Sequence, residues 1–179
     1  LGIEYNPDLV VLSKENAKKE GVTNAEFVRG DIFETDFTQA TVLTLFLLPQ
    51  LNLKLRPTIL DMKPGTRVVS NTFNMAEWEP DQTIEAGGDC TSYCRAFFWV
   101  VPAKVAGTWK MPQGELKLDQ SFQKLSGTLT VDGKAMPISD AKMTGAQITF
   151  TAGAKTYTGR VDGNTMSGTS DGGWTATRS

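Results

Sequence analysis

The feature that most constrains the fold is a regular series of turn sequences in the second half of the chain. Short runs of Thr, Val, Ile and aromatic residues alternate there with turn pairs such as Asp132-Gly133, Ala152-Gly153 and Asp162-Gly163. Turns of this kind join antiparallel strands in hairpins. The pattern predicts a small all-β domain over residues 103–179, an antiparallel barrel or a sandwich. About eight short strands are expected, near residues 106–111, 115–122, 125–131, 135–142, 146–152, 155–161, 164–169 and 173–178.

The end of this β segment leaves two arrangements open. Strand 173–178 either pairs with strand 106–111 and closes a barrel, or returns to the sheet formed by the first half of the chain. We favour closure because a closed meander has no exposed strand edges. Trp109 and Trp174 lie in the first and last predicted strands. We expect them to pack where the sheet closes, with a ligand clamp as the alternative role.

Residues 1–102 show a different pattern, in which strands and helices alternate. Asn6 is a good N-cap and Pro7 suits the first turn of a helix, so a helix is predicted over residues 7–20. The continuous apolar run 41–48 predicts a strand buried on both faces of a parallel sheet. The remaining elements complete a partial, mostly parallel Rossmann-like α/β domain: strands near 25–28, 66–73 and 93–101, a helix over 50–62 that Pro57 should distort or split, and a loop over 74–92.

Composition excludes several kinds of function. The chain has no histidine, which removes Ser-His-Asp and Cys-His catalysis and histidine metal ligands. Its 18 basic and 20 acidic residues argue against a protein that holds nucleic acid by bulk charge. No apolar run approaches the roughly 20 residues of a membrane span. Cys90 and Cys94 cannot form a four-ligand metal site by themselves. Their spacing allows a small disulfide loop or a weak metal pair, but two free thiols are the favoured interpretation.

Two acidic residues lie where an α/β sheet binds its ligands, just beyond the carboxyl ends of strands. Glu4 ends the first predicted strand, and its carboxylate could accept hydrogen bonds from both hydroxyls of a ribose. Asp31 follows the second strand, where it could accept from the exocyclic amine of adenine while Ile32 packs on the base. Each feature alone has an ordinary alternative, a solvated acid or a turn. Together they form one half of a nucleoside pocket.

Two longer stretches, GIEYNPDLVVLSKENAKKEGVTNAEFVRGDIFETDF and ATVLTLFLLPQLNLKLRPTILDMKPGTRVVSNTF, resemble class I S-adenosylmethionine-dependent methyltransferases, most closely a bacterial group. The resemblance covers roughly residues 1–102, and the second stretch is the more specific. It implies that Glu4 holds the ribose, and that Asp31 and Ile32 hold the adenine. It also implies that the segment from Phe46 to Gln50, with Leu48 and Pro49, faces the methyl donor and acceptor.

The sequence departs from this family in two places. The family's glycine-rich loop would lie before Leu1, so we expect an upstream part to be missing and this chain to be inactive and to bind S-adenosylmethionine weakly, if at all. Raw sheet edges would then favour self-association. Asn71 and Asn74 stand where relatives often carry His and Asp, and they cannot act as bases. Catalytic residues and the methyl acceptor are therefore left unassigned. No targeting segment indicates a compartment, and a non-catalytic protein that binds a ligand or partner through its β domain is the alternative.

Overall fold

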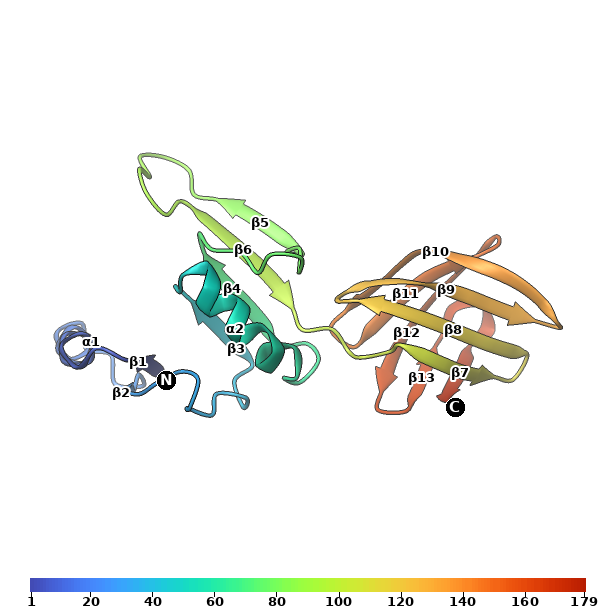
Figure 1. Cartoon of the computed structure of the whole chain (residues 1–179), viewed down its shortest axis with the longest axis horizontal. Helices are drawn as coiled ribbons and strands as arrows, with labels where there is room; N and C mark the ends of the chain where they lie inside the picture. Colours follow the sequence, from blue (N-terminus) through green and yellow to red (C-terminus); the bar gives the residue numbers. More distant parts are fainter. The chain divides into compact units, whose positions relative to one another are not determined.

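The structure is a computed structural model that describes the backbone of residues 1–179 and every side chain except that of Asp171. The chain divides into two compact units, residues 1–39 and 40–179, which are described separately. The first unit contains β1 (Gly2–Glu4), α1 (Pro7–Lys19) and β2 (Phe27–Arg29), with β1 and β2 parallel (Figure 1). The Asn6 side chain accepts a hydrogen bond from the Asp8 amide, so the predicted N-cap of this helix is confirmed.

The second unit begins with a four-stranded sheet of order β3-β4-β6-β5. Its β3 and β4 are parallel, whereas β6 runs antiparallel to both β4 and β5. Together with the parallel pair of the first unit, this confirms the prediction of a partial, largely parallel α/β region. The elements are β3 (Val42–Leu45), α2 (Pro49–Leu60), β4 (Arg67–Asn71), β5 (Gln82–Glu85) and β6 (Arg95–Val100).

Three local predictions in this region are wrong. Strand β3 is not buried on both faces, because it is the edge strand of its sheet and Val42 and Thr44 are exposed. Pro57 does not end α2, since the helix continues around it to Leu60. The predicted loop over 74–92 contains β5, which pairs with β6 although all four of its residues are exposed.

The two cysteines are not free thiols. Cys90 and Cys94 form a disulfide whose Cα atoms lie 5.8 Å apart. The bond closes a small loop in the connection between β5 and β6. Of the alternatives that the sequence left open, the disulfide is the one that the structure contains.

Residues 107–178 form a closed antiparallel barrel of eight strands, at the right of Figure 1. The last strand pairs with the first, Thr177 with Lys110 and Arg178 with Trp109, so the prediction of closure is confirmed. Each strand lies within about two residues of its predicted position. The strands are β7 (Gly107–Met111), β8 (Gly114–Ser121), β9 (Lys124–Val131), β10 (Lys134–Thr144), β11 (Gln147–Ala152), β12 (Lys155–Asp162), β13 (Thr165–Gly168) and β14 (Trp174–Arg178).

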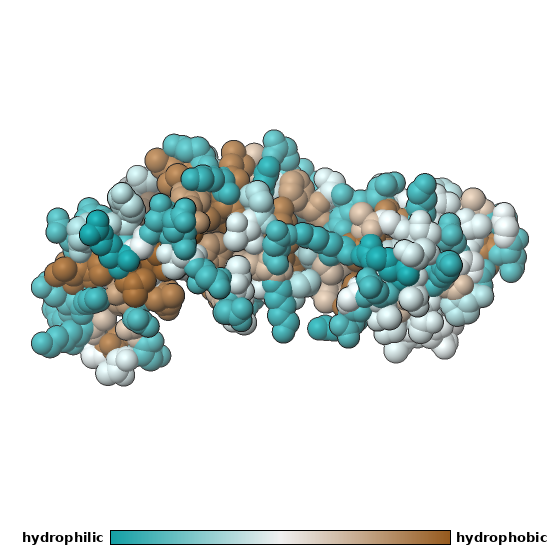
Figure 2. All heavy atoms as spheres, turned by 60° about the horizontal axis from the view of Figure 1, so that its bottom comes forward, coloured by the Kyte–Doolittle hydropathy of each residue, from teal (hydrophilic) through white to brown (hydrophobic). Residues whose placement is uncertain are grey.

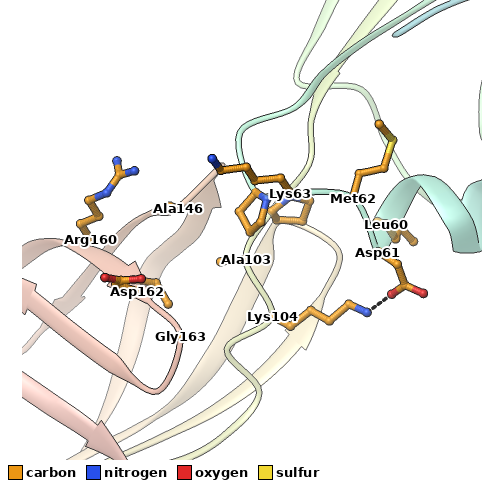
Figure 3. Close-up of a pocket in the computed structure, with 13 residues that line it drawn as sticks. Leu60, Asp61, Met62, Lys63, Ala103, Lys104, Ala146, Arg160, Asp162 and Gly163 are labelled. Carbon is orange, nitrogen blue, oxygen red and sulfur yellow. Dashed lines mark hydrogen bonds and ion pairs between the residues drawn. The ribbon is translucent and has the colours of Figure 1, made fainter. Parts of the chain in front are cut away.

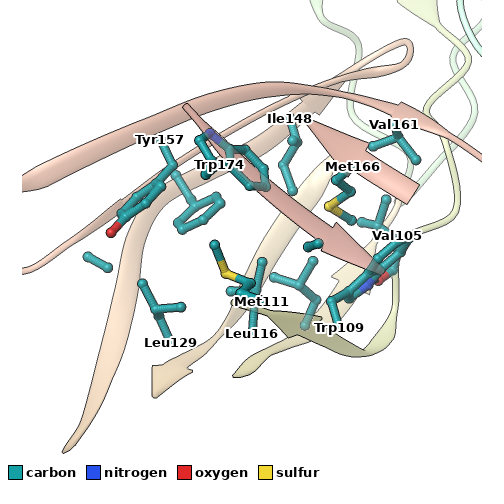
Figure 4. Close-up of a cluster of buried hydrophobic side chains, with 14 of the residues drawn as sticks. Val105, Trp109, Met111, Leu116, Leu129, Ile148, Tyr157, Val161, Met166 and Trp174 are labelled. Atoms are coloured by element: carbon teal, nitrogen blue, oxygen red, sulfur yellow. The ribbon is translucent and has the colours of Figure 1, made fainter. Parts of the chain in front are cut away.

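The interior of the barrel is filled by its own side chains (Figure 4). Trp109 is fully buried and donates its indole hydrogen bond to the Val105 carbonyl. Trp174 meets the rings of Phe150 and Tyr157 edge-on. Both tryptophans therefore belong to the core, as the packing interpretation predicted. A filled interior of this kind leaves no ligand chamber inside the barrel.

The barrel packs against the sheet of its own unit through aromatic and polar contacts. Trp78 is fully buried, and its ring stacks on Phe122 at 6.0 Å between centroids. Glu79 forms an ion pair with Lys124 on β9, and its carbonyl accepts a hydrogen bond from Gln123. Among the residues that the structure describes, no helix has the length and hydrophobicity needed to cross a membrane.

Candidate functional site

The first unit brings the two predicted acidic residues to the same edge of its sheet. Glu4 ends β1 opposite Arg29 on β2, and the Gly30 amide donates a hydrogen bond of 3.0 Å to the Glu4 carbonyl. Asp31 follows immediately. The carboxyl ends of the two parallel strands are therefore held side by side, as the nucleoside hypothesis requires.

Each of these carboxylates uses one oxygen to fix its own loop. Glu4 Oε1 accepts from the Asn6 amide at 2.8 Å, and Asp31 Oδ1 accepts from the Phe33 amide at 2.9 Å. The second oxygen of each has no hydrogen-bond partner among the described residues. A pair of carboxylates with one orientation-fixing bond and one available oxygen each suits the hydroxyl and amine donors of a nucleoside.

Ile32 lies half-buried in the turn that Asp31 organises. The Asp31 carbonyl accepts hydrogen bonds from both the amide and the hydroxyl of Thr35, at 2.9 and 2.7 Å. Gly30 has little space, since a β-carbon there would lie 2.9 Å from Thr35 Oγ1. This turn is consequently tight and well defined, which gives an apolar side chain beside Asp31 a fixed position.

The other predicted site residues lie in the second unit, on the segment between β3 and α2. Phe46 and Leu48 are exposed, and Pro49 occupies the first turn of α2. Leu48 is the N-cap residue, and it provides no side-chain hydrogen bond to the helix. The first unit thus holds Glu4, Asp31 and Ile32 on adjacent strand ends, and the second holds the rest on one segment. That the two sets form a single pocket stays a prediction.

Two residues that the sequence analysis did not select gather with Phe46. The Phe46 ring lies 5.1 Å from the Tyr93 ring and 6.0 Å from the Phe73 ring, and the Phe73 and Tyr93 centroids are 6.4 Å apart. We call these three residues the aromatic trio. They come from three separate connections, so no local sequence pattern links them. They all lie at the carboxyl edge of β3 and β4, since β6 runs antiparallel and starts at that edge.

The loop after β4 is anchored by α2. Asn52 is completely buried, and its amide nitrogen lies 3.2 Å from Ser70 Oγ and 3.1 Å from the Phe73 carbonyl. Ser70 donates a second hydrogen bond to the same carbonyl, at 2.6 Å. These contacts fix the backbone from which the Phe73 side chain projects. They also show why α2 places an amide, not an apolar residue, at position 52.

A separate cavity of about 420 Å³ lies beside the end of the barrel (Figure 3). It is lined by the turn after α2, the 102–104 connection and the β12–β13 turn. Its charged side chains include Lys63, Arg160 and Asp162, and Asp61 forms an ion pair with Lys104 at its rim. Charges of both signs line this cavity, so it favours no particular class of ligand.

Exposed apolar side chains are concentrated outside the barrel. Figure 2 shows brown atoms gathered over the α/β part of the chain, whereas the barrel surface at the right is mostly white and teal. Within the second unit, each large exposed hydrophobic residue of the described chain precedes the barrel: Val42, Phe46, Leu48, Leu53, Ile84 and Tyr93. An uneven distribution of this kind marks the α/β part as the region that meets ligands or other protein surface.

Comparison with known proteins identifies this region. Residues 1–82 match the ANTKMT methyltransferase domain. This part of the chain belongs to the S-adenosylmethionine-dependent methyltransferases. The methyltransferase region is 41% identical over 87 residues to a protein-lysine N-methyltransferase of Saccharolobus islandicus, a match that covers 48% of this chain and 54% of the relative. It is 32% identical over 91 residues to a human ATP synthase lysine N-methyltransferase, covering 50% of this chain and 39% of that protein.

A solved structure supports the same assignment. The crystal structure of an RNA methyltransferase from Salinibacter ruber, in complex with S-adenosyl-L-homocysteine, matches with a TM-score of 0.52 and 45% identity. The match covers 58% of this chain and 66% of that one. The chain thus spans about half the length of the curated relatives that it matches. The matches to the two curated relatives cover about half of this chain, the length of the α/β region alone.

Proposed function

We propose that the methyltransferase region transfers a methyl group from S-adenosylmethionine to the ε-amine of a lysine in a protein. The observation that carries this proposal is the match of residues 1–82 to the ANTKMT methyltransferase domain, together with two relatives named as lysine N-methyltransferases. In this reaction the neutral amine attacks the methyl carbon. The C–N bond forms, the C–S bond breaks with its electron pair going to sulfur, and the amine loses a proton to water.

The residues of the first unit fit one half of the cofactor. We assign the ribose hydroxyls to Glu4 and the adenine amine to Asp31, because each carboxylate keeps an oxygen without a partner among the described residues. Ile32 would cover one face of the base. We assign the segment with Phe46, Leu48 and Pro49 to the side where the methyl group meets its acceptor. Transfer between a sulfonium and an amine depends mainly on alignment at close range, so a chain without histidine is compatible with it.

The chain offers a closely matched pair of variants to test this assignment. Asp31 and Asp36 are both exposed, and both accept a hydrogen bond from the amide two residues ahead. Only Asp31 lies at a strand end beside Glu4. Calorimetric titration with S-adenosyl-L-homocysteine should show binding that Asp31→Asn weakens about tenfold, as expected for loss of a charged hydrogen bond, whereas Asp36→Asn leaves it unchanged. Equal effects of the two changes would contradict the adenine assignment.

Activity itself is measured by transfer of a labelled methyl group to lysine-containing peptides and to matched arginine peptides. Incorporation into the lysine peptides alone is the expected result. Incorporation into RNA in place of peptide would contradict the lysine acceptor. No transfer, together with no homocysteine product, would favour the second candidate, a non-catalytic binding protein. The cavity beside the barrel is the observation that keeps this candidate in view.

A further inference from the structure

The aromatic trio is an exposed cluster of rings for which the packing of the fold gives no reason. The Phe46 side chain is 59% exposed and the Tyr93 side chain 56% exposed, and Phe73 is half-buried. Rings that serve only as core are covered, as Trp78 and Trp99 are in the same unit. Three rings held within 6.4 Å of one another at the surface instead form a preassembled apolar wall.

The wall has the geometry of a site for a cation. Phe46 and Tyr93 meet at an interplanar angle of 83°, whereas Phe46 and Phe73 lie at 25°. Rings at different angles present both faces and edges to the same space. A cation is attracted to aromatic faces, and recognition of quaternary ammonium groups and methylated lysine uses several such rings together. The surrounding charge also suits a cation, because residues 1–102 carry 14 acidic and nine basic side chains.

The disulfide holds the third ring in place. Tyr93 is directly adjacent to Cys94 and has a positive φ of 56°, a conformation that is costly for a bulky side chain. The Cys90–Cys94 bond joins two residues only four positions apart. The Ala86 amide also donates to the Cys94 carbonyl, which ties the loop to the end of the β5–β6 hairpin. A short, crosslinked loop of this kind can maintain a conformation that a free chain would leave.

We propose that Phe46, Phe73 and Tyr93 bind the alkylammonium end of the acceptor lysine, and that the Cys90–Cys94 disulfide positions Tyr93 for this contact. The inference rests on the proposed function for the identity of the acceptor. Its location agrees, since the trio lies at the carboxyl edge of β3 and β4, where α/β sheets place their ligands. The trio then selects an acceptor by its aliphatic stem and positive charge, before the amine loses its proton and reacts.

The binding test does not depend on activity. The full chain is titrated with Nα-acetyl-Nε-trimethyllysine methylamide and with the neutral isostere in which carbon replaces the quaternary nitrogen, and both are followed by NMR of the probe. We expect the cation to bind at least about fivefold more tightly than the isostere, with upfield-shifted methyl signals. Tyr93→Ala and Phe46→Ala should each abolish the preference, whereas Tyr93→Phe should retain it. Val42→Ala, at the opposite end of β3, should change nothing.

Three results would overturn the inference: equal affinity for the two probes, a preference that survives Tyr93→Ala, or a loss that Val42→Ala reproduces. A preference unchanged in the Cys90→Ser/Cys94→Ser double variant would overturn the role of the disulfide. Circular dichroism of each variant verifies that it remains folded.

The methyl-transfer assay then separates the two proposals. Cation binding without transfer to any lysine peptide leaves the trio intact and contradicts the proposed function. Transfer to lysine peptides whose KM is unaffected by Tyr93→Ala, together with no cation preference, contradicts the trio and leaves the proposed function intact. If both hold, Tyr93→Ala raises the KM for the peptide about fivefold and leaves the affinity for S-adenosyl-L-homocysteine unchanged.

Discussion

Asn52 provides a quantitative test of how the loop after β4 is supported. Its side chain is fully buried, and its NH₂ group lies within hydrogen-bond distance of Ser70 Oγ, the Phe73 carbonyl and the Asn74 carbonyl, at 3.2, 3.1 and 3.4 Å. An NH₂ group has only two hydrogens, so two good bonds are the most that it makes at one time. Asn52→Ala removes both of them and leaves a small cavity.

The expected cost follows from what remains paired afterwards. The Phe73 carbonyl keeps its 2.6 Å bond from Ser70, and Asn74 is exposed and can bond to water. Neither group is left without a partner. The loss is therefore two net hydrogen bonds of about 1 kcal/mol each, plus roughly 1 kcal/mol for the cavity. We expect Asn52→Ala to destabilise the sheet by about 2–3 kcal/mol.

Asn52→Asp keeps the shape of the side chain and reverses its hydrogen bonding. A carboxylate would face carbonyl oxygens, which raises the pKa of the new acid above its ordinary value of about 3.9. A raised acid pKa means that the folded state binds the extra proton. The penalty should therefore be smallest below about pH 4 and should grow as the pH rises through the folded-state pKa.

Urea unfolding followed by tryptophan fluorescence measures these changes. Trp78 and Trp99 report on the sheet, and Trp109 and Trp174 report on the barrel. Leu53→Ala, at an exposed neighbouring position of α2, is the control and should cost less than about 0.5 kcal/mol. A cost below about 0.5 kcal/mol for Asn52→Ala, or an Asn52→Asp penalty that shrinks as the pH rises, would refute the reasoning.

Three further outcomes are expected. Gly168→Ala should destabilise the barrel by about 3 kcal/mol in thermal unfolding, because a β-carbon there would lie 2.1 Å from the Thr158 carbonyl oxygen and 2.3 Å from Trp174 Nε1; Gly87→Ala, which meets open space, is the control. The hydrogen bond from Arg56 holds the pKa of Glu77 below its ordinary value. Its stabilising effect is thus complete above the ordinary pKa and lost as the pH falls through the lowered one, so the stability difference between the chain and Glu77→Gln should shrink in acid. Sedimentation equilibrium should show self-association through the exposed apolar surface of the α/β part, and a monomer at high concentration would contradict that expectation.

The barrel shows how much local sequence can predict. Strand positions follow from alternation of apolar and polar residues, and the turns follow from pairs such as Asp132-Gly133, where both residues have positive φ, at 49° and 76°. Closure followed from the cost of leaving two edges unpaired. These are short-range or general constraints, so they can be read without coordinates.

The α/β part shows where such reasoning fails. Strand β5 carries no buried residue, so its sequence has no apolar alternation, and it is a strand only because β6 offers it partners. The loss of one hydrogen bond at Pro57 is outweighed by burial of Leu55 and Ile59 on either side of it in α2. Helix and strand were settled in both cases by packing, which propensity does not record.

The sequence by itself determined the methyltransferase resemblance, the candidate cofactor residues Glu4 and Asp31, and the order of the elements, because these depend on residue identity and local spacing. Only the tertiary structure decided that Phe46, Phe73 and Tyr93 meet and that the two cysteines are bonded. The three rings lie 27 and 20 positions apart in the sequence, and they come together because strand pairing places the ends of β3 and β4 and the start of β6 at one edge of the sheet. Contacts of this kind are set by the pairing of distant strands, and no local pattern in the sequence encodes them.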